Sequence, residues 1–300
     1  MKILKTIFLL LLIGNFTGHA QYTETINSNR PGSSQGAFAV GPGVLQFEAG
    51  GKYGGQEHIL LDTRSDLWGI DYMVRYGFMF EELEVNLSGS FLNTAIDYER
   101  GASTETREVR NFESNSIGLK YLVYDPYKYA KEKKPNLYSW NAAPEFYWSD
   151  LIPAVSVYAG ANFAFGDNPY LYEGEGKFSP KLAVITQNNW GAWVLVLNLI
   201  ADKLGQEYPT YAGIATLTHS FNQRFAVFTE FQEIISDIYS DEIIRAGLAY
   251  LFHQDLQADI SGLYNFKHTP SRWEVALGLS YRFDWHKQDQ FLERAEDLAK

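Results

Sequence analysis

Residues 273–283 read WEVALGLSYRF, and an apolar side chain stands at every second position of this stretch. One face would carry Trp273, Val275, Leu277, Leu279, Tyr281 and Phe283, and the other face the small or polar residues between them. Successive side chains of a β-strand point to opposite sides of the strand. The strict alternation therefore predicts a long strand with one apolar and one polar face.

The same alternation recurs along most of the chain. The candidate strands are residues 44–53, 68–76, 83–91, 117–124, 154–163, 180–188, 192–201, 211–220, 225–232, 243–252, 256–264 and 273–283. These are about twelve strands, most of them close to ten residues long, as strands that cross a membrane at a tilt need to be.

The links between the strands decide the class of β-protein. Short links at 78–82, 189–191, 221–224 and 253–255 alternate with longer polar links at 54–66, 92–113, 165–178, 202–210 and 233–242. Tight turns at one end and long loops at the other are typical of a transmembrane barrel, and strands in lipid must close because an open edge leaves backbone groups unpaired. We predict an all-β fold, an up-and-down antiparallel β-barrel with short periplasmic turns and longer acidic extracellular loops. The long lysine-rich link at 125–152 departs from this pattern.

The N-terminus has the features of a signal peptide. Lys2 and Lys5 precede an apolar run at 7–13, and Gly18 and Ala20 suit cleavage after residue 20. The predicted organisation is a signal peptide over 1–20, a periplasmic N-terminal segment over 21–43, the barrel over 44–283 and a periplasmic tail over 284–300 with a short amphipathic helix over 288–298. Export and strands together predict the outer membrane, with its lipid, the barrel-assembly machinery and periplasmic chaperones as partners.

Composition narrows the possibilities further. Aromatic residues make up 16% of the chain, and a lipid-facing coat at the two membrane boundaries would account for them. The alternative, a soluble β-sandwich, would favour shorter strands without aromatic residues at both ends. Without Lys2 and Lys5, 23 basic residues stand against 36 acidic ones, a net charge of −13 that argues against a nucleic-acid partner. Most of the excess falls in the long loops, above all Glu233, Asp237, Asp241 and Glu242, which predicts an acidic rim that disfavours anions or binds divalent cations.

Several short motifs resemble one known family. They are NRPG at 29–32, VGPG at 40–43, LQFEAG at 45–50, RYG at 75–77, LEV at 83–85, GLKY at 118–121, FTE at 228–230, LQADI at 256–260 and SYRF at 280–283. In order and spacing they resemble the outer-membrane barrel family "Putative MetA-pathway of phenol degradation", although Asn29 stands where the family pattern has Asp. The resemblance implies a transporter barrel, and the family name implies the passage of aromatic compounds.

Charged residues on the predicted inner face are close to balance. The acids are Glu48, Asp71, Glu84, Glu230, Asp259 and Glu274, and the bases are Lys52, Arg75, Lys120, Arg245 and Arg282. About twelve strands make a barrel between the filled small barrels and the open porins. The charges could form a lattice of ion pairs that fills the lumen, or a polar constriction that sorts solutes. The candidates for a constriction are Arg75, Lys120, Glu230 and Arg245, which the predicted strands place mid-strand.

Nothing in the sequence indicates catalysis. His219 and Ser220 are neighbours on a predicted strand, so their side chains point to opposite faces and cannot form a nucleophile and base pair. The histidines lack the spacing of metal ligands, and the glycines lack the spacing of a phosphate-binding loop. We therefore expect no enzyme, no cofactor and no metal. Two functions stay open: a channel or transporter for small solutes, apolar or aromatic compounds among them, and a non-transporting barrel with a structural or surface-binding role.

Overall fold

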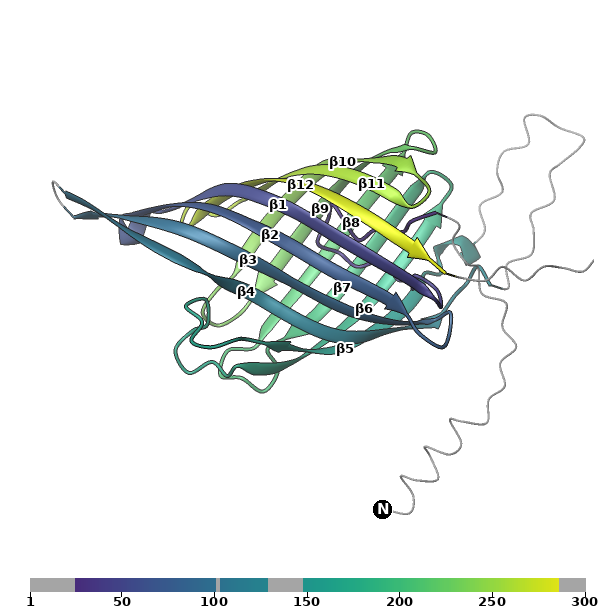
Figure 1. The fold of residues 1–300 in the computed structure, drawn as a ribbon, viewed down its shortest axis with the longest axis horizontal. Helices are drawn as coiled ribbons and strands as arrows, with labels where there is room; N and C mark the ends of the chain where they lie inside the picture. The colour runs from purple at the N-terminus through teal and green to yellow at the C-terminus, as the bar shows by residue number, and fades with distance from the viewer. Residues whose placement is uncertain (1–24, 101–102, 129–147, 286–300) are drawn as a thin grey trace, which may run out of the picture.

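Twelve β-strands close into a single antiparallel barrel (Figure 1). A computed structural model describes residues 25–100, 103–128 and 148–285. The strands are β1 (Val44–His58), β2 (Thr63–Gly77), β3 (Leu83–Arg100), β4 (Ser103–Tyr124), β5 (Ala154–Phe163), β6 (Phe178–Trp190), β7 (Trp193–Asp202), β8 (Thr210–Ser220), β9 (Phe225–Ile235), β10 (Asp241–His253), β11 (Leu256–Asn265) and β12 (Ser271–Asp284), with short 3-10 helices η1 (Ile59–Leu61) and η2 (Trp148–Leu151). Each strand pairs with the next, and β1 pairs with β12. The predicted up-and-down barrel is confirmed.

Three predicted features fall outside the described residues. They are the signal peptide over 1–20, the helix over 288–298 and most of the lysine-rich link. In the described part of the chain, no helix is long and apolar enough to cross a membrane.

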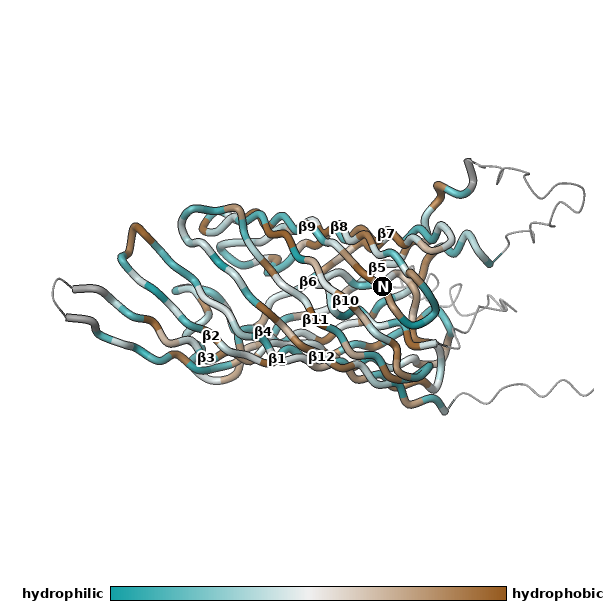
Figure 2. Tube along the Cα trace, turned by 90° about the horizontal axis from the view of Figure 1, so that it is seen from above, coloured by the Kyte–Doolittle hydropathy of each residue, from teal (hydrophilic) through white to brown (hydrophobic). Residues whose placement is uncertain are grey.

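The hairpins β1–β2 and β3–β4 are longer than predicted. Residues 54–66 and 92–113 were expected as loops, but β3 and β4 are 18 and 22 residues long and stay paired from Leu83 to Arg100. The two hairpins extend beyond the other strands at one end of the barrel (Figures 1 and 2). Outside lipid both faces of a hairpin can be polar, so the ladder continues where the apolar alternation stops. We refer to this end as the long-hairpin end and to the opposite one as the short-turn end.

The outer face of the barrel is apolar. Hydrophobic and hydrophilic residues alternate along the strands in Figure 2, as expected for one face toward lipid and one toward the lumen. Nine aromatic residues were predicted on the outward face, and all except the half-buried Phe91 are exposed: Tyr53, Trp68, Tyr76, Phe78, Tyr121, Trp273, Tyr281 and Phe283. Some form edge-to-face pairs across strands, such as Tyr53 with Trp273 at 5.9 Å between ring centroids.

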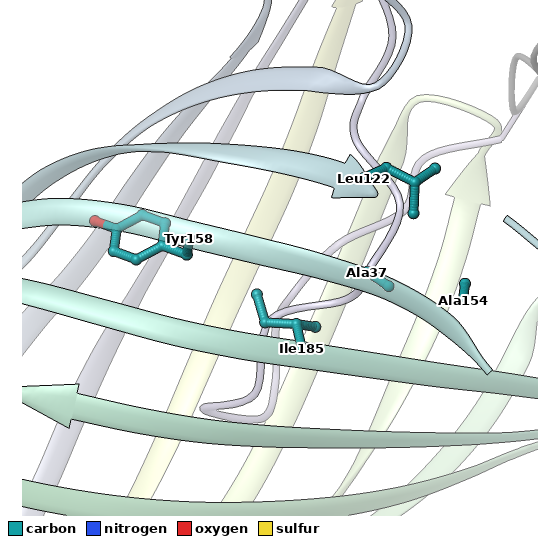
Figure 3. Packing of buried hydrophobic residues seen from close by; sticks show 5 residues of the cluster. All are labelled: Ala37, Leu122, Ala154, Tyr158 and Ile185. Carbon is teal, nitrogen blue, oxygen red and sulfur yellow. The ribbon is translucent and has the colours of Figure 1, made fainter. Parts of the chain in front are cut away.

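Residues 25–43, which we name the inner segment, lie inside the barrel and not beside it. Ala37 and Val40 are buried, and Ala37 packs with Leu122, Tyr158 and Ile185 from β4, β5 and β6 (Figure 3). The expectation of a separate periplasmic segment therefore does not describe these residues. The segment has no apolar period because its contacts with the wall are mainly polar and run through its backbone.

Candidate functional site

The backbone of the inner segment is held by side chains from nine of the twelve strands. These side chains are Glu48 (β1), Arg75 (β2), Glu84 (β3), Lys120 (β4), Ser156 (β5), Gln187 (β6), Asn198 (β7), Glu230 (β9) and Gln257 (β11). A chain without secondary structure can be buried only if such partners satisfy its N–H and C=O groups. The polar inner face of the barrel is thus matched to a strip of polypeptide.

The first charged cluster lies near the short-turn end and joins β1, β2, β3 and β4. Arg75 donates to both oxygens of Glu84 at 2.9 and 2.8 Å and to Glu48 at 3.3 Å. The Lys120 ammonium lies 3.4 Å from the Glu84 carboxylate. All four side chains are almost fully buried. Two cations and two anions cancel, so the cluster is neutral as a whole.

This first cluster also binds the inner segment directly. Glu84 accepts from the Val40 amide at 3.1 Å, and Lys120 donates to the carbonyls of Gly36 and Phe38 at 2.9 and 3.0 Å. Hydrogen bonds to charged partners are stronger than neutral ones. The cluster therefore fastens residues 36–40 to the wall.

The second cluster is centred on Glu230 of β9. Its carboxylate accepts from the Ser33 and Ser34 amides at 2.9 and 3.2 Å, and from the Thr216 hydroxyl at 2.7 Å. Arg245 of β10 forms an ion pair with the same carboxylate. Like the first cluster, this one joins the wall to the inner segment.

The four predicted constriction residues are thus divided between two clusters. Arg75 and Lys120 belong to the first, and Glu230 and Arg245 to the second. The expectation that all four lie mid-strand is wrong for Arg75 and Lys120, which stand two and four residues before the ends of β2 and β4 at the short-turn end. Sequence reasoning missed the partners on the inner segment, because nothing in residues 25–43 repeats. One sequence feature could have indicated such a contact. Asn198 is the single polar residue in the β7 stretch WVLVLNLI, and a buried asparagine needs a hydrogen-bond partner.

Two cavities lie on either side of the inner segment. The long-hairpin cavity has a volume of about 440 Å³ and reaches Lys52, Asp71 and Arg272. The short-turn cavity has a volume of about 200 Å³ and reaches Val196, Thr218 and Phe228. Residues 29–32 line both cavities.

One wall of the long-hairpin cavity is aliphatic. It is formed by Ile200, Ile214, Ile234, Ile243 and Leu263, which we name the aliphatic row. Ile214 and Ile243 both pair with Gln232, two residues from Ile234, so these three are diagonal neighbours on adjacent strands. The register places Ile200 and Leu263 at the two ends of the row in the same way. Apolar residues on the inner face of five neighbouring strands make a wall that an apolar group can contact.

The opposite wall of this cavity is polar. Lys52 lies 2.9 Å from Asp71 and 3.7 Å from Glu113, and it donates to the Ser90 hydroxyl at 3.0 Å. Arg272 forms an ion pair with Glu274. Because these charges are already paired, the cavity offers hydrogen-bonding groups and has no strong preference for one sign of solute charge.

The long-hairpin end carries part of the predicted acidic rim. Glu233, Asp237 and Glu242 are exposed. The prediction is wrong for Asp241, which is buried. Its side chain is 2% exposed and accepts hydrogen bonds from the side-chain amide of Asn265 and the hydroxyl of Tyr239. Burial, and then the hydrogen bond to Asp241, raise the pKa of Tyr239. Of these four acidic residues, the other three can therefore contribute to such a rim.

Within the described ranges, no group of three or more His, Asp or Glu side chains could hold a metal ion.

None of the curated proteins matches the chain in sequence. Among solved structures, an outer membrane channel from Pseudomonas putida F1 is 9% identical, with 86% of this chain and 100% of that chain covered at a TM-score of 0.55. The NanC porin is 10% identical, with 78% and 98% covered at a TM-score of 0.49. At these identities the likeness concerns the fold.

The family comparison covers most of the chain. Residues 28–283 match the family described as "Putative MetA-pathway of phenol degradation", a range that includes all twelve strands up to Phe283 and most of the inner segment. The motifs that resembled this family in the sequence fall within the matched range. This chain belongs to that family of β-barrel proteins.

Proposed function

We propose that the protein is an outer-membrane channel for small solutes that join an apolar part to hydrogen-bonding groups. The observation that carries the proposal is the long-hairpin cavity, in which the aliphatic row faces a wall of paired charges and hydroxyl groups. A sugar finds partners on only one of these walls, whereas an amphipathic solute can satisfy both. Family membership and the barrel fold support the same function.

The inner segment, together with Arg75, Lys120, Glu230 and Arg245, forms the constriction in this proposal. These side chains act by holding the segment across the lumen. Their charges are paired, so the constriction selects by size and polarity more than by the sign of charge. The exposed carboxylates at the long-hairpin end would contribute whatever preference for cations the channel has.

Liposome swelling tests this function with two neutral probes of similar mass that cross lipid poorly. Phenyl glucoside has an apolar ring on a sugar, whereas glucosylglycerol has a glycerol on the same sugar. We expect faster swelling in phenyl glucoside. No swelling in either solute would contradict the channel and favour the second open function, a barrel with a structural or surface-binding role.

Ile243 and Ile244 offer a matched pair of variants, because they are neighbours on opposite faces of β10. Ile243 is buried in the aliphatic row, and Ile244 is exposed on the outer face. Ile243→Thr should slow phenyl glucoside about fivefold, since loss of about 1 kcal/mol of apolar contact corresponds to that factor. Ile244→Thr should leave the rate unchanged. Equal effects of the two variants would contradict a role for the aliphatic row.

The cellular placement belongs to the same proposal. Signal-peptide cleavage after Ala20 would leave Gln21 as the first residue, which mass spectrometry of protein from the outer-membrane fraction would detect. Assembly would depend on periplasmic chaperones and on the barrel-assembly machinery. A folded barrel should also run as a heat-modifiable band on a gel, and a protein that fractionates as soluble without such a shift would contradict the placement.

A further inference from the structure

The two cavities are separated by one short turn of the inner segment. Asn29, Arg30, Pro31 and Gly32 line the long-hairpin cavity and also the short-turn cavity. These four residues therefore lie at the boundary between the two cavities. We name residues 29–33 the septum turn.

Arg30 fixes the septum turn to the wall at a site formed by Asp259, Gly50 and Gly278, which we name the seat of Arg30. Its guanidinium donates to both oxygens of Asp259 on β11, at 3.2 and 3.0 Å. It also lies against Gly50 of β1 and Gly278 of β12, which pair with each other in register. A Cβ atom at either glycine would overlap the guanidinium. Only glycine at both positions leaves room for Arg30 to reach Asp259.

The chain on both sides of the septum turn is fastened independently. Before the turn, the hydroxyls of Ser28 and Ser280 are 2.7 Å apart. After the turn, the hydroxyls of Ser34 and Thr216 are 2.7 Å apart. The clusters around Glu84 and Glu230 then hold the rest of the segment, as described above.

In the middle of the turn, Arg30 makes the contacts with the wall. Pro31 has no N–H group to donate. The Arg30 carbonyl accepts one hydrogen bond, from Gln257 at 3.2 Å. The Arg30 amide also donates to the Glu48 carboxylate at 3.2 Å, so this hydrogen bond and the ion pair between Arg30 and Asp259 hold the middle of the turn to the wall.

We propose that Arg30 is the positioning residue of the gate, and that the channel opens when the septum turn leaves its seat while residues 28 and 34 stay fastened. This inference rests on the proposed channel function. The movement needed is local, because residues 29–32 line both cavities. It breaks the ion pair between Arg30 and Asp259 and the hydrogen bonds that the amides of the turn donate to Glu48 and Glu230. The remainder of the inner segment keeps its hydrogen bonds and continues to narrow the lumen.

Two engineered disulfides separate this local opening from expulsion of the whole segment. The chain has no cysteine, so Ser28→Cys with Ser280→Cys and Ser34→Cys with Thr216→Cys add the only thiols. Each pair replaces two hydroxyls already in contact. Bond formation is checked by mass spectrometry, and the heat-modifiable band shift reports folding. We expect the oxidised four-cysteine variant to swell in phenyl glucoside within about twofold of its reduced form. Loss of swelling on oxidation would overturn the proposal.

Variants of the seat test the role of Arg30 in planar bilayers. Gly278→Ala and Arg30→Ala should each raise the open probability about tenfold to a hundredfold, as expected when a buried ion pair is lost from one of two states. Arg30→Lys, which keeps the charge but not the two-point contact, should fall between these variants and the wild type. Gly51→Ala is the matched control, because a Cβ atom there meets nothing within 4 Å.

The outcomes separate failure of the gate from failure of the channel. If Arg30 has only a structural role, its variants will unfold more easily while the open probability stays at the wild-type value, and this result overturns the inference alone. If the wild type and every variant pass neither ions nor solutes, the proposed function and the inference both fail. A closed wild type with open seat variants would support both.

Discussion

Glu84 is the side chain whose removal should affect the stability of the barrel most clearly. Its carboxylate is fully buried, pairs with Arg75 and Lys120, and accepts from the Val40 amide. In the wild type the charges of Arg75, Lys120, Glu48 and Glu84 add to zero. Glu84→Gln leaves a net charge of +1 out of reach of water. Breaking a buried ion pair by removing one partner costs about 3 kcal/mol.

The free energy of unfolding can be measured by urea titration in lipid vesicles, with tryptophan fluorescence as the signal. We expect Glu84→Gln to lower it by about 3 kcal/mol. Glu82→Gln is the matched control, because Glu82 pairs with Lys128 at 2.9 Å in the adjacent turn and both side chains are partly exposed. An ion pair of that kind contributes less than about 1 kcal/mol.

A double-mutant cycle tests whether charge balance is the cause. Lys120→Met should cost less in the Glu84→Gln background than in the wild type, since it removes the charge left without a partner. We expect a coupling of at least about 1 kcal/mol. Additive effects of the two substitutions, or a loss below about 1 kcal/mol for Glu84→Gln alone, would refute the reasoning.

Three further predictions concern the outside of the barrel. Tyr170→Phe should expose the β5–β6 loop to faster proteolysis, because the Tyr170 hydroxyl lies 3.2 Å from a backbone carbonyl of β4. Trp273→Ala should lower the free energy of unfolding in vesicles by about 2 kcal/mol while the heat-modifiable shift persists, since the ring lies on the lipid face. Neutralising Glu233, Asp237 and Glu242 together should shift the reversal potential in a salt gradient toward lower cation preference, and an unchanged potential would exclude them as a selective rim.

The barrel can be predicted from the sequence because a strand with one face toward lipid must carry an apolar residue at every second position. Residues 273–283 alternate over their whole length, and β12 (Ser271–Asp284) has that alternation as its two faces. The same reasoning fails for residues 92–113, since beyond the lipid nothing requires an apolar face, and most residues of this part of the β3–β4 ladder are polar. Strand periodicity therefore marks the part of each strand that lipid covers, and the ladder itself can run further.

The inner segment was beyond such reasoning for a different physical reason. It packs through backbone groups, and every residue except proline carries the same N–H and C=O. The wall residues that bind the inner segment, such as Glu48 and Glu230, could be recognised as inward-facing. The residue type of a glutamate does not indicate, however, that its carboxylate accepts from backbone amides. Arg30 was visible as part of the NRPG motif, yet its seat depends on Gly50 and Gly278, which come together only through the β1–β12 register.

The width of the barrel explains why its inner charges have two tasks. Twelve strands enclose more space than side chains alone can fill, and fewer strands than an open porin has. A strip of polypeptide fills such a lumen, but its amides must then be satisfied without water. Carboxylates suit this task, because Glu48 and Glu230 each accept from two successive amides of the strip. Once those carboxylates are buried they need cations, which Arg75 and Arg245 supply. The sequence left an ion-pair lattice and a constriction as alternatives. In the function that we propose, the same side chains build both, so removing a charge should affect stability and passage together.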